Sequence, residues 1–207
     1  MASKIQKIIK HSDNPKLIED AFLFAKEFYK DKKRLSGENY IHHVVRVTSV
    51  LDSMKMGSTV IAFGFLHDAL DDLPPYTKKI ALADIENKFG EEIADLVKKI
   101  SDLSKIRYSL AINVKEKKIA TKNKVENLRR MFLAMAGDLR VILVELISRI
   151  DGSNFLQYLP EEKQALYALE TLQIFAPIAN RLGLGEIRRN LEDISFYYLS
   201  KDRFNWL

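Results

Sequence analysis

The sequence predicts an all-α fold, and three observations support this prediction. Apolar residues recur at helical spacing along almost the whole chain, whereas alternation with a period of two is nearly absent. The 207 residues include only eight glycines and five prolines, so long irregular stretches are not expected. No internal repeat, low-complexity tract or linker-like segment interrupts the chain. We therefore expect one compact multi-helix domain over residues 1–207.

The first half of the chain has four segments with a helical pattern. Helices are predicted at residues 16–30, 39–54, 58–71 and 82–100. In the first of these, Leu17, Ala21 and Phe24 share one apolar stripe. The third is predicted to be a buried helix, with Ser58 as its candidate N-cap and Pro74-Pro75 as its stop signal.

The second half begins with a polar, poorly periodic stretch at residues 101–120, which predicts a loop. Beyond it, helices are predicted at residues 122–137, 138–151, 161–180 and 184–199. The run VILVELI at 141–147 has the composition of a buried strand. It lies within a longer helical pattern and has no partner strand, so a helix is favoured.

Composition limits the class of protein. The chain has no cysteine, which excludes disulfides and thiolate metal sites and favours a reducing compartment. No apolar run approaches the ~20 residues of a membrane helix, and no signal peptide is evident, so we expect a cytoplasmic protein without a membrane partner. The net charge of +5 is compatible with a phosphate-rich ligand. Without a dense basic stripe, a helical nucleic-acid-binding protein is only a fallback hypothesis.

The segment GFLHDALDDLPP carries the strongest chemical signal. His67 and Asp68 are adjacent, and Asp71 and Asp72 follow each of them by four residues, one helical turn further along. Burying four ionisable groups beside the apolar AFGFL stretch would be costly without a cation or strong partners. The pattern therefore predicts a metal site.

A second histidine pair lies in the segment YIHHVVRV. Two separate histidine positions with a carboxylate suit a divalent ion such as Mn²⁺, Fe²⁺ or Zn²⁺. We interpret His42 as an exposed residue and His43 as a metal ligand rather than a hydrogen-bonded core histidine.

Four segments together resemble a known family. RLSGENYIHHVVRVTSVL, FLHDALDD, ENLRRMFLAMAGDLRVILVEL and ETLQIFAPIANRLGLGEIRRNLEDISFYYL are similar to the amino-terminal HD-type hydrolase domain of long RelA/SpoT homologues. The resemblance runs from about residue 20 to the end, and residues 176–207 resemble the connector toward a synthetase domain. It implies an HD-domain fold, removal of the 3′-pyrophosphate from guanosine tetra- or pentaphosphate (ppGpp or pppGpp), one Mn²⁺ ion and a C-terminal synthetase domain in the longer protein.

The same resemblance assigns roles to individual residues. His43, His67 and Asp68 match metal ligands, and Asp71 with Asp72 match the acidic pair that positions or activates the attacking water. The residues that it places near the nucleotide are Arg34, Ser36, Gly152 and Asn154.

The sequence departs from the family at the fourth metal ligand, where Ser148 stands in place of an aspartate. Asp151, one helical turn away, would need a local shift to replace it. Leu35, Gly152 and Phe155 also differ from the family around the nucleotide. We therefore favour a hydrolase domain whose activity is weak or lost. Two alternatives stay open: a silent regulatory domain that binds nucleotide beside a synthetase, and an HD phosphohydrolase acting on another nucleotide.

Overall fold

The computed structural model describes the backbone of residues 2–71, 73–115 and 137–200, and the side chains of residues 3–71, 73–103 and 137–200. Within these ranges every regular element is helical, and the only β feature is an isolated bridge between Lys33 and Asn39. The all-α prediction is therefore confirmed. None of the described helices is long and apolar enough to cross a membrane.

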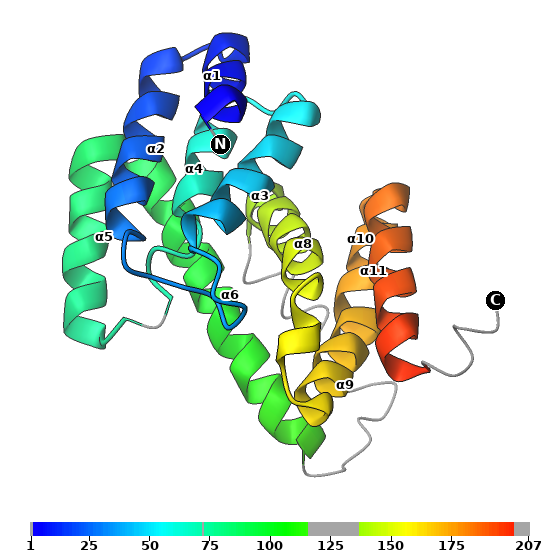
Figure 1. The fold of residues 1–207 in the computed structure, drawn as a ribbon. Coiled ribbons are helices and arrows are strands. Elements are labelled where there is room, and N and C mark those ends of the chain that lie inside the picture. Colours follow the sequence, from blue (N-terminus) through cyan, green and yellow to red (C-terminus); the bar gives the residue numbers. More distant parts are fainter. Residues whose placement is uncertain (1, 72, 116–136, 201–207) are drawn as a thin grey trace. The chain divides into compact units, whose positions relative to one another are not determined.

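The chain divides into two compact units, and helix α8 (Leu139–Ser153) belongs partly to each (Figure 1). The first unit comprises Met1–Ser104 with Ala136–Ser148, and the second comprises Lys105–Met135 with Arg149–Leu207. The single domain over 1–207 and the connector at 176–207 stay predictions.

Helix α4 (Ser58–Leu66) is the central element of the first unit. It is apolar on all sides, and eight of its nine residues are buried, as expected for a helix surrounded by protein. It packs against α2 and α3. The other helices with residues in this unit are α1 (Ala2–His11), α2 (Pro15–Phe28), α3 (Ile41–Ser53), α5 (Pro75–Phe89), the first part of α6 (Glu91–Lys115) and the first part of α8.

Gly64 allows α3 to approach α4 closely. A Cβ atom at this position would lie 2.7 Å from Leu51 Cδ1 and 3.0 Å from Thr48 Cγ2, closer than ordinary van der Waals contact. The two helices run antiparallel (Figure 1), so the start of α3 and the end of α4 lie at the same end of the pair. This arrangement brings His43 and His67 together.

The N-terminus of α4 is capped from another part of the chain. Ser58 is not the N-cap that its position predicts, because it is the first helical residue after the N-cap Gly57. The Asp13 carboxylate accepts hydrogen bonds from the Ser58 hydroxyl and, at 3.1 Å, from its backbone N–H. These bonds lower the pKa of Asp13. Helix α1, which precedes this cap, was missed by the sequence pattern, although its Ile5 and Ile8 share a buried face.

The predicted helix at 58–71 is too long. The α-helix ends at Leu66, and the chain continues in tight turns. The backbone N–H of Ala69 bonds to Leu66 O at 2.9 Å, and that of Asp71 to Asp68 O at 3.1 Å. These bonds span three residues rather than four, so the His67-Asp68 pair lies in a turn at the helix end rather than on a helix.

Two further predicted boundaries are wrong. The segment 82–100 belongs to two helices, because Gly90 has a φ of 86° and ends α5 in the left-handed conformation that favours glycine. Helix α6 then continues to Lys115, where a loop was predicted at 101–120. The predicted helix at 122–137 lies outside the described residues except for Gly137.

The second unit contains the end of α8 and a run of helices. They are the 3₁₀ turn η1 (Leu156–Tyr158), α9 (Glu161–Glu170), the π-helical turn η2 (Thr171–Phe175), α10 (Ala176–Arg181) and α11 (Gly185–Leu199). The helices predicted at 161–180 and 184–199 correspond to α9 through α10 and to α11. The wide turn η2 comes just before Pro177, which lacks a backbone N–H and cannot donate the usual helical hydrogen bond.

Arg149 holds the end of α8 within the second unit. Only 2% of its surface is exposed. Its guanidinium contacts the Glu170 carboxylate at 2.5 Å and donates to Thr171 Oγ1 at 2.8 Å. It also lies 3.9 Å from the ring centre of Tyr167 and 4.0 Å from that of Phe175. The charge is thus paired and fully surrounded, as a buried cation requires.

Candidate metal centre

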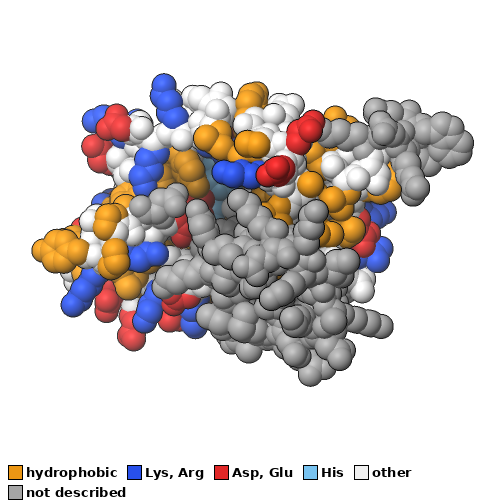
Figure 2. All heavy atoms as spheres, turned by 90° about the horizontal axis from the view of Figure 1, so that it is seen from below, with side chains coloured by type: hydrophobic (Ala, Val, Ile, Leu, Met, Phe, Trp, Pro, Cys, Tyr) orange, Lys and Arg blue, Asp and Glu red, His pale blue; other side chains and the backbone are white. Residues whose placement is uncertain are grey.

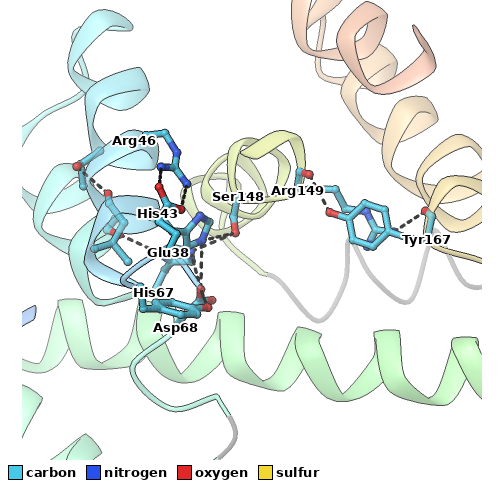
Figure 3. Close-up of polar contacts among 12 residues, drawn as sticks. Glu38, His43, Arg46, His67, Asp68, Ser148, Arg149 and Tyr167 are labelled. Carbon is cyan, nitrogen blue, oxygen red and sulfur yellow. Dashed lines mark hydrogen bonds and ion pairs between the residues drawn. The ribbon is translucent and has the colours of Figure 1, made fainter. Parts of the chain in front are cut away.

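Three predicted metal ligands converge at one end of the α3–α4 pair (Figure 3). His43 lies in the first turn of α3, and His67 and Asp68 follow α4 directly. Asp68 Oδ2 lies 3.3 Å from Nε2 of each histidine. One ligand atom from each residue lies within 4.8 Å of the others. Figure 2, which views the molecule from below, shows pale-blue histidine atoms in a recess among other side chains.

The His67 ring is oriented for metal binding by the backbone. Its Nδ1 lies 2.8 Å from the carbonyl oxygen of Gly64. A bond from Nδ1–H to a backbone carbonyl is the usual outer contact of a metal-binding histidine, and it leaves Nε2, beside Asp68, as the nitrogen that would bind a cation. Two imidazole nitrogens and one carboxylate oxygen suit a divalent cation of the Mn²⁺, Fe²⁺ or Zn²⁺ kind. The donor set therefore fits a divalent metal.

Tyr40 is a site residue that the sequence reasoning missed. Its hydroxyl donates to Asp68 Oδ2 at 2.6 Å, and its ring lies edge-on to that of His43, 5.5 Å between centres. Burial and the charge of Asp68 raise the pKa of Tyr40 far above its ordinary value, so the hydroxyl keeps its proton. Tyr40 precedes His43 by three residues, and this spacing was the available signal.

The ligand charges compensate one another. Burial alone would raise the pKa of Asp68, but the positive charge of His67 and hydrogen bonds from His43 and His67 hold it well below its usual range. Burial lowers the pKa of His67, yet the Asp68 carboxylate outweighs this effect and raises it. Both shifts arise from the attraction between the buried imidazole and the buried carboxylate, and metal binding would require the imidazole without its extra proton.

Ser148, on α8, lies beside both histidines. Its hydroxyl oxygen is 3.2 Å from His67 Nε2 and 3.3 Å from His43 Nε2. Figure 3 shows this side chain pointing at the two rings. The structure therefore brings Ser148 to the ligand atoms, where it offers a neutral hydroxyl instead of a negative carboxylate.

Glu145 is a second residue that the sequence reasoning missed. Its side chain is buried, with 2% of the residue exposed, and it lies one helical turn before Ser148 on α8. Its negative charge contributes to the raised pKa of His67. Glu145 therefore adds a carboxylate near the ligands, on the helix where Ser148 lacks one.

The remaining predicted site residues are distributed over both units. Asp71 lies in the turn after Asp68 and contributes to raising the pKa of Tyr29. The paired residue Asp72 lies outside the described residues. Asp151, Gly152 and Asn154 belong to the second unit, at and just beyond the end of α8.

The predicted nucleotide-binding loop is fixed to α3. Arg34 donates its backbone N–H to Glu38 O at 2.8 Å, and its guanidinium lies 5.9 Å from the Tyr40 ring centre. Ser36 Oγ accepts the backbone N–H of Glu38 at 3.4 Å. The Glu38 carboxylate binds Arg46 of α3 through two bonds, at 2.6 and 2.9 Å. These bonds were not predicted, and they hold Arg34 and Ser36 on the metal-ligand side of α3. His42 is exposed, as expected.

The HD domain family matches residues 21–185, which is most of the chain. The chain therefore belongs to the HD domain family. Within it, the relatives of this chain are RelA/SpoT-type proteins. It is 43% identical over 188 residues to a probable guanosine-3′,5′-bis(diphosphate) 3′-pyrophosphohydrolase of Synechocystis, covering 91% of this chain and 23% of the relative.

Two other relatives carry different activities in their names. A GTP pyrophosphokinase of Myxococcus xanthus is 37% identical over 91% of this chain and 23% of the relative. The bifunctional (p)ppGpp synthase/hydrolase SpoT of Escherichia coli is 35% identical over 93% of this chain and 25% of the relative. The chain thus spans about a quarter of the length of these relatives.

The fold also matches a solved structure. A metazoan ortholog of SpoT that hydrolyses ppGpp superposes with a TM-score of 0.63 and 18% identity, over 89% of this chain and 96% of that chain. This match supports the HD-type all-α fold.

Proposed function

We propose that this chain is a Mn²⁺-dependent (p)ppGpp 3′-pyrophosphohydrolase-type domain whose hydrolytic activity is weak or lost through Ser148. The observation that carries the proposal is the convergence of His43, His67 and Asp68, with Ser148 beside the two histidines. The substrate class follows from the names of the relatives.

Different residues of the chain would bind the metal, activate the water and hold the nucleotide. His43, His67 and Asp68 would hold the cation, which supplies a water of lowered pKa and offsets phosphate charge. Asp71 and Asp72 would position the attacking water and accept its proton. In the first unit, Arg34 and Ser36, on the loop before α3, would hold the nucleotide, because a planar guanidinium suits both stacking on a purine and phosphate pairing. In the second unit, Gly152 and Asn154 are nucleotide-binding candidates on the family resemblance alone.

Ser148 weakens this arrangement in a specific way. A hydroxyl is a poorer ligand for a hard divalent ion than a carboxylate, and it contributes no negative charge. Ser148 leaves three strong ligands, and Glu145 lies in the vicinity without joining the three-residue cluster. We expect the cation to bind weakly as a result. Asp151 is the proposed rescue, and it would act through a local shift of the end of α8.

Two alternative functions keep particular support. A silent regulatory domain is favoured by the Ser148 hydroxyl, which lies within hydrogen-bond distance of both histidines and supplies no negative charge. In that case a synthetase domain elsewhere in a longer protein would be its partner. A different nucleotide substrate is favoured by Leu35, which is 78% exposed in the loop with Arg34 and is one of the positions that differ from the family around the nucleotide.

The proposal is tested by pyrophosphate release from ppGpp with and without Mn²⁺, using Escherichia coli SpoT in parallel. We expect turnover by this chain to be at least tenfold slower, and a His43→Ala variant to lose whatever Mn²⁺-dependent activity remains. Turnover equal to that of SpoT would refute the altered-site proposal. Mn²⁺ and ppGpp binding without turnover would support the regulatory alternative, and faster release from another nucleotide would support the third.

A further inference from the structure

A cavity lies at the other end of the α3–α4 pair, away from the metal ligands. Its volume is about 870 Å³, and it is lined by α1, the end of α3 and the start of α4. Asp52 and Gly57 line it at the α3–α4 connection, whereas His43 and His67 lie at the opposite helix ends. Helix α3 has 13 residues and so spans ~20 Å. The cavity is therefore separate from the candidate metal centre.

Three lysines give the cavity a positive charge. Lys4 and Lys7 come from α1, and Lys55 from the α3–α4 connection. Within the described part of the chain, none of the three forms an ion pair. Two carboxylates also line the cavity, but both are engaged: Asp13 accepts the hydroxyl and backbone N–H of Ser58, and Asp52 lies 3.4 Å from His11 Nδ1. Hydrogen bonding does not neutralise a carboxylate, so the lining sets three lysine charges against two carboxylate charges, a formal net charge of +1 with His11 neutral.

Lys55 has a backbone conformation that favours glycine. Its φ is 57°, and it is the only non-glycine residue with a positive φ among those described. It follows the C-cap of α3, where the Met56 N–H bonds to Leu51 O at 3.1 Å and closes the helix end. Glycine would meet this backbone requirement with less strain. Lysine adds an ammonium group at the cavity wall that glycine would not supply.

The other residues of the lining suit the uncharged part of an organic ligand. Ile8 and Ile61 form a buried apolar floor, each 2% exposed. Ser49 and Ser53 donate their hydroxyl protons to Val45 O and Val50 O, so their oxygens remain free to accept hydrogen bonds from a ligand hydroxyl. A cavity of this volume falls within the usual range for small-molecule sites.

We propose that this cavity is a second ligand site, which binds a phosphorylated small molecule of nucleotide size. The three ammonium groups match the phosphates, the serine oxygens match sugar hydroxyls and the isoleucine floor matches an apolar or ring face. The site is independent of the metal ligands and of the proposed hydrolase function.

The test is isothermal titration calorimetry of GTP into the 207-residue chain in the presence of EDTA. Lys7→Gln and Lys55→Gly should each weaken GTP binding at least fivefold. Lys10→Gln is the matched control, because Lys10 is an exposed lysine of α1 that does not line the cavity. It should bind GTP as the unmodified chain does, and so should a His67→Ala variant.

The Tm of the Lys55→Gly variant distinguishes a lost ligand contact from a folding defect. Glycine relieves the left-handed backbone strain, so the Tm without ligand should rise while GTP binding falls. The proposal is refuted if the unmodified chain does not bind GTP, or if Lys10→Gln weakens binding as much as Lys7→Gln. Loss of binding in His67→Ala would equally refute it, because the GTP would then occupy the metal-centre side.

Discussion

Replacing Ser148 with aspartate should restore the missing charge at the candidate metal centre. The Ser148 oxygen already lies 3.2 and 3.3 Å from the two histidine Nε2 atoms, so a carboxylate on the same backbone has only one further bond to span. Divalent ions bind histidine nitrogens and carboxylate oxygens at about 2.0–2.2 Å. An aspartate oxygen can therefore reach an ion held by His43, His67 and Asp68 without a backbone shift.

The expected gain in Mn²⁺ affinity is the difference between an electrostatic attraction and a desolvation cost. Two unit charges about 4 Å apart attract by about 4 kcal/mol at the effective dielectric of a protein site, and more when one partner is divalent. Desolvating a buried carboxylate takes back several kcal/mol. A net gain of about 2–3 kcal/mol corresponds to roughly 30- to 150-fold tighter Mn²⁺ binding.

Isothermal titration calorimetry with Mn²⁺ measures this change directly, and pyrophosphate release from ppGpp should rise with it. Ser148→Asn is the matched control, because it has nearly the shape of aspartate without the charge. Without metal, the new carboxylate repels Asp68, so Ser148→Asp should have a lower Tm in EDTA than the unmodified chain. If Ser148→Asp binds Mn²⁺ no more tightly than Ser148→Asn, the missing charge is not the defect.

Three further predictions concern the elements that position the site. Tyr40→Phe removes the hydroxyl that donates to Asp68 Oδ2. Mn²⁺ affinity measured by calorimetry should then fall about tenfold, with little loss of Tm. Unchanged affinity would exclude a role for Tyr40 in positioning Asp68. Gly64→Ala places a methyl group 2.7 Å from Leu51 Cδ1 of α3. Denaturant unfolding should show that the free energy of unfolding falls by about 1–3 kcal/mol. An unchanged free energy of unfolding would mean that the two helices can separate slightly. The bonds from Arg46 lower the pKa of Glu38 below its ordinary value of 4.5. Its contribution to stability is therefore present above about pH 4.5 and lost as the pH falls below it, so Glu38→Gln should flatten the acid side of a Tm-versus-pH curve.

The helical fold and three candidate metal-binding residues that lie together could be predicted from local signals. The apolar period predicted α2, α3, α9 and α11, because each buries one stripe. His43, His67 and Asp68 stood out because ionisable residues next to apolar runs need a partner. The end of α4 could not be predicted, because an uninterrupted apolar pattern gives no sign of where four-residue hydrogen bonds change to three-residue turns.

The contacts around the ligands depend on long-range packing. Tyr40 bonds to Asp68, 28 residues away, and Ser148 meets His43 across 105 residues. The sequence contains the residues but not the register of α8 against α3 and α4 that brings them together. Glu145 was overlooked for the same reason: as one acidic residue in an apolar run, its nearness to His67 becomes evident only after packing.

The α3–α4 pair has one further consequence, which is thermodynamic. The pair carries the candidate metal ligands at one end and the phosphate-ligand cavity at the other, and Gly64 packs its two helices with little room to slide. If a ligand in the cavity changes Mn²⁺ affinity by some factor, Mn²⁺ must change the affinity of that ligand by the same factor. Titrating either one in the presence of the other therefore measures a single coupling free energy, and the two orders of addition must agree.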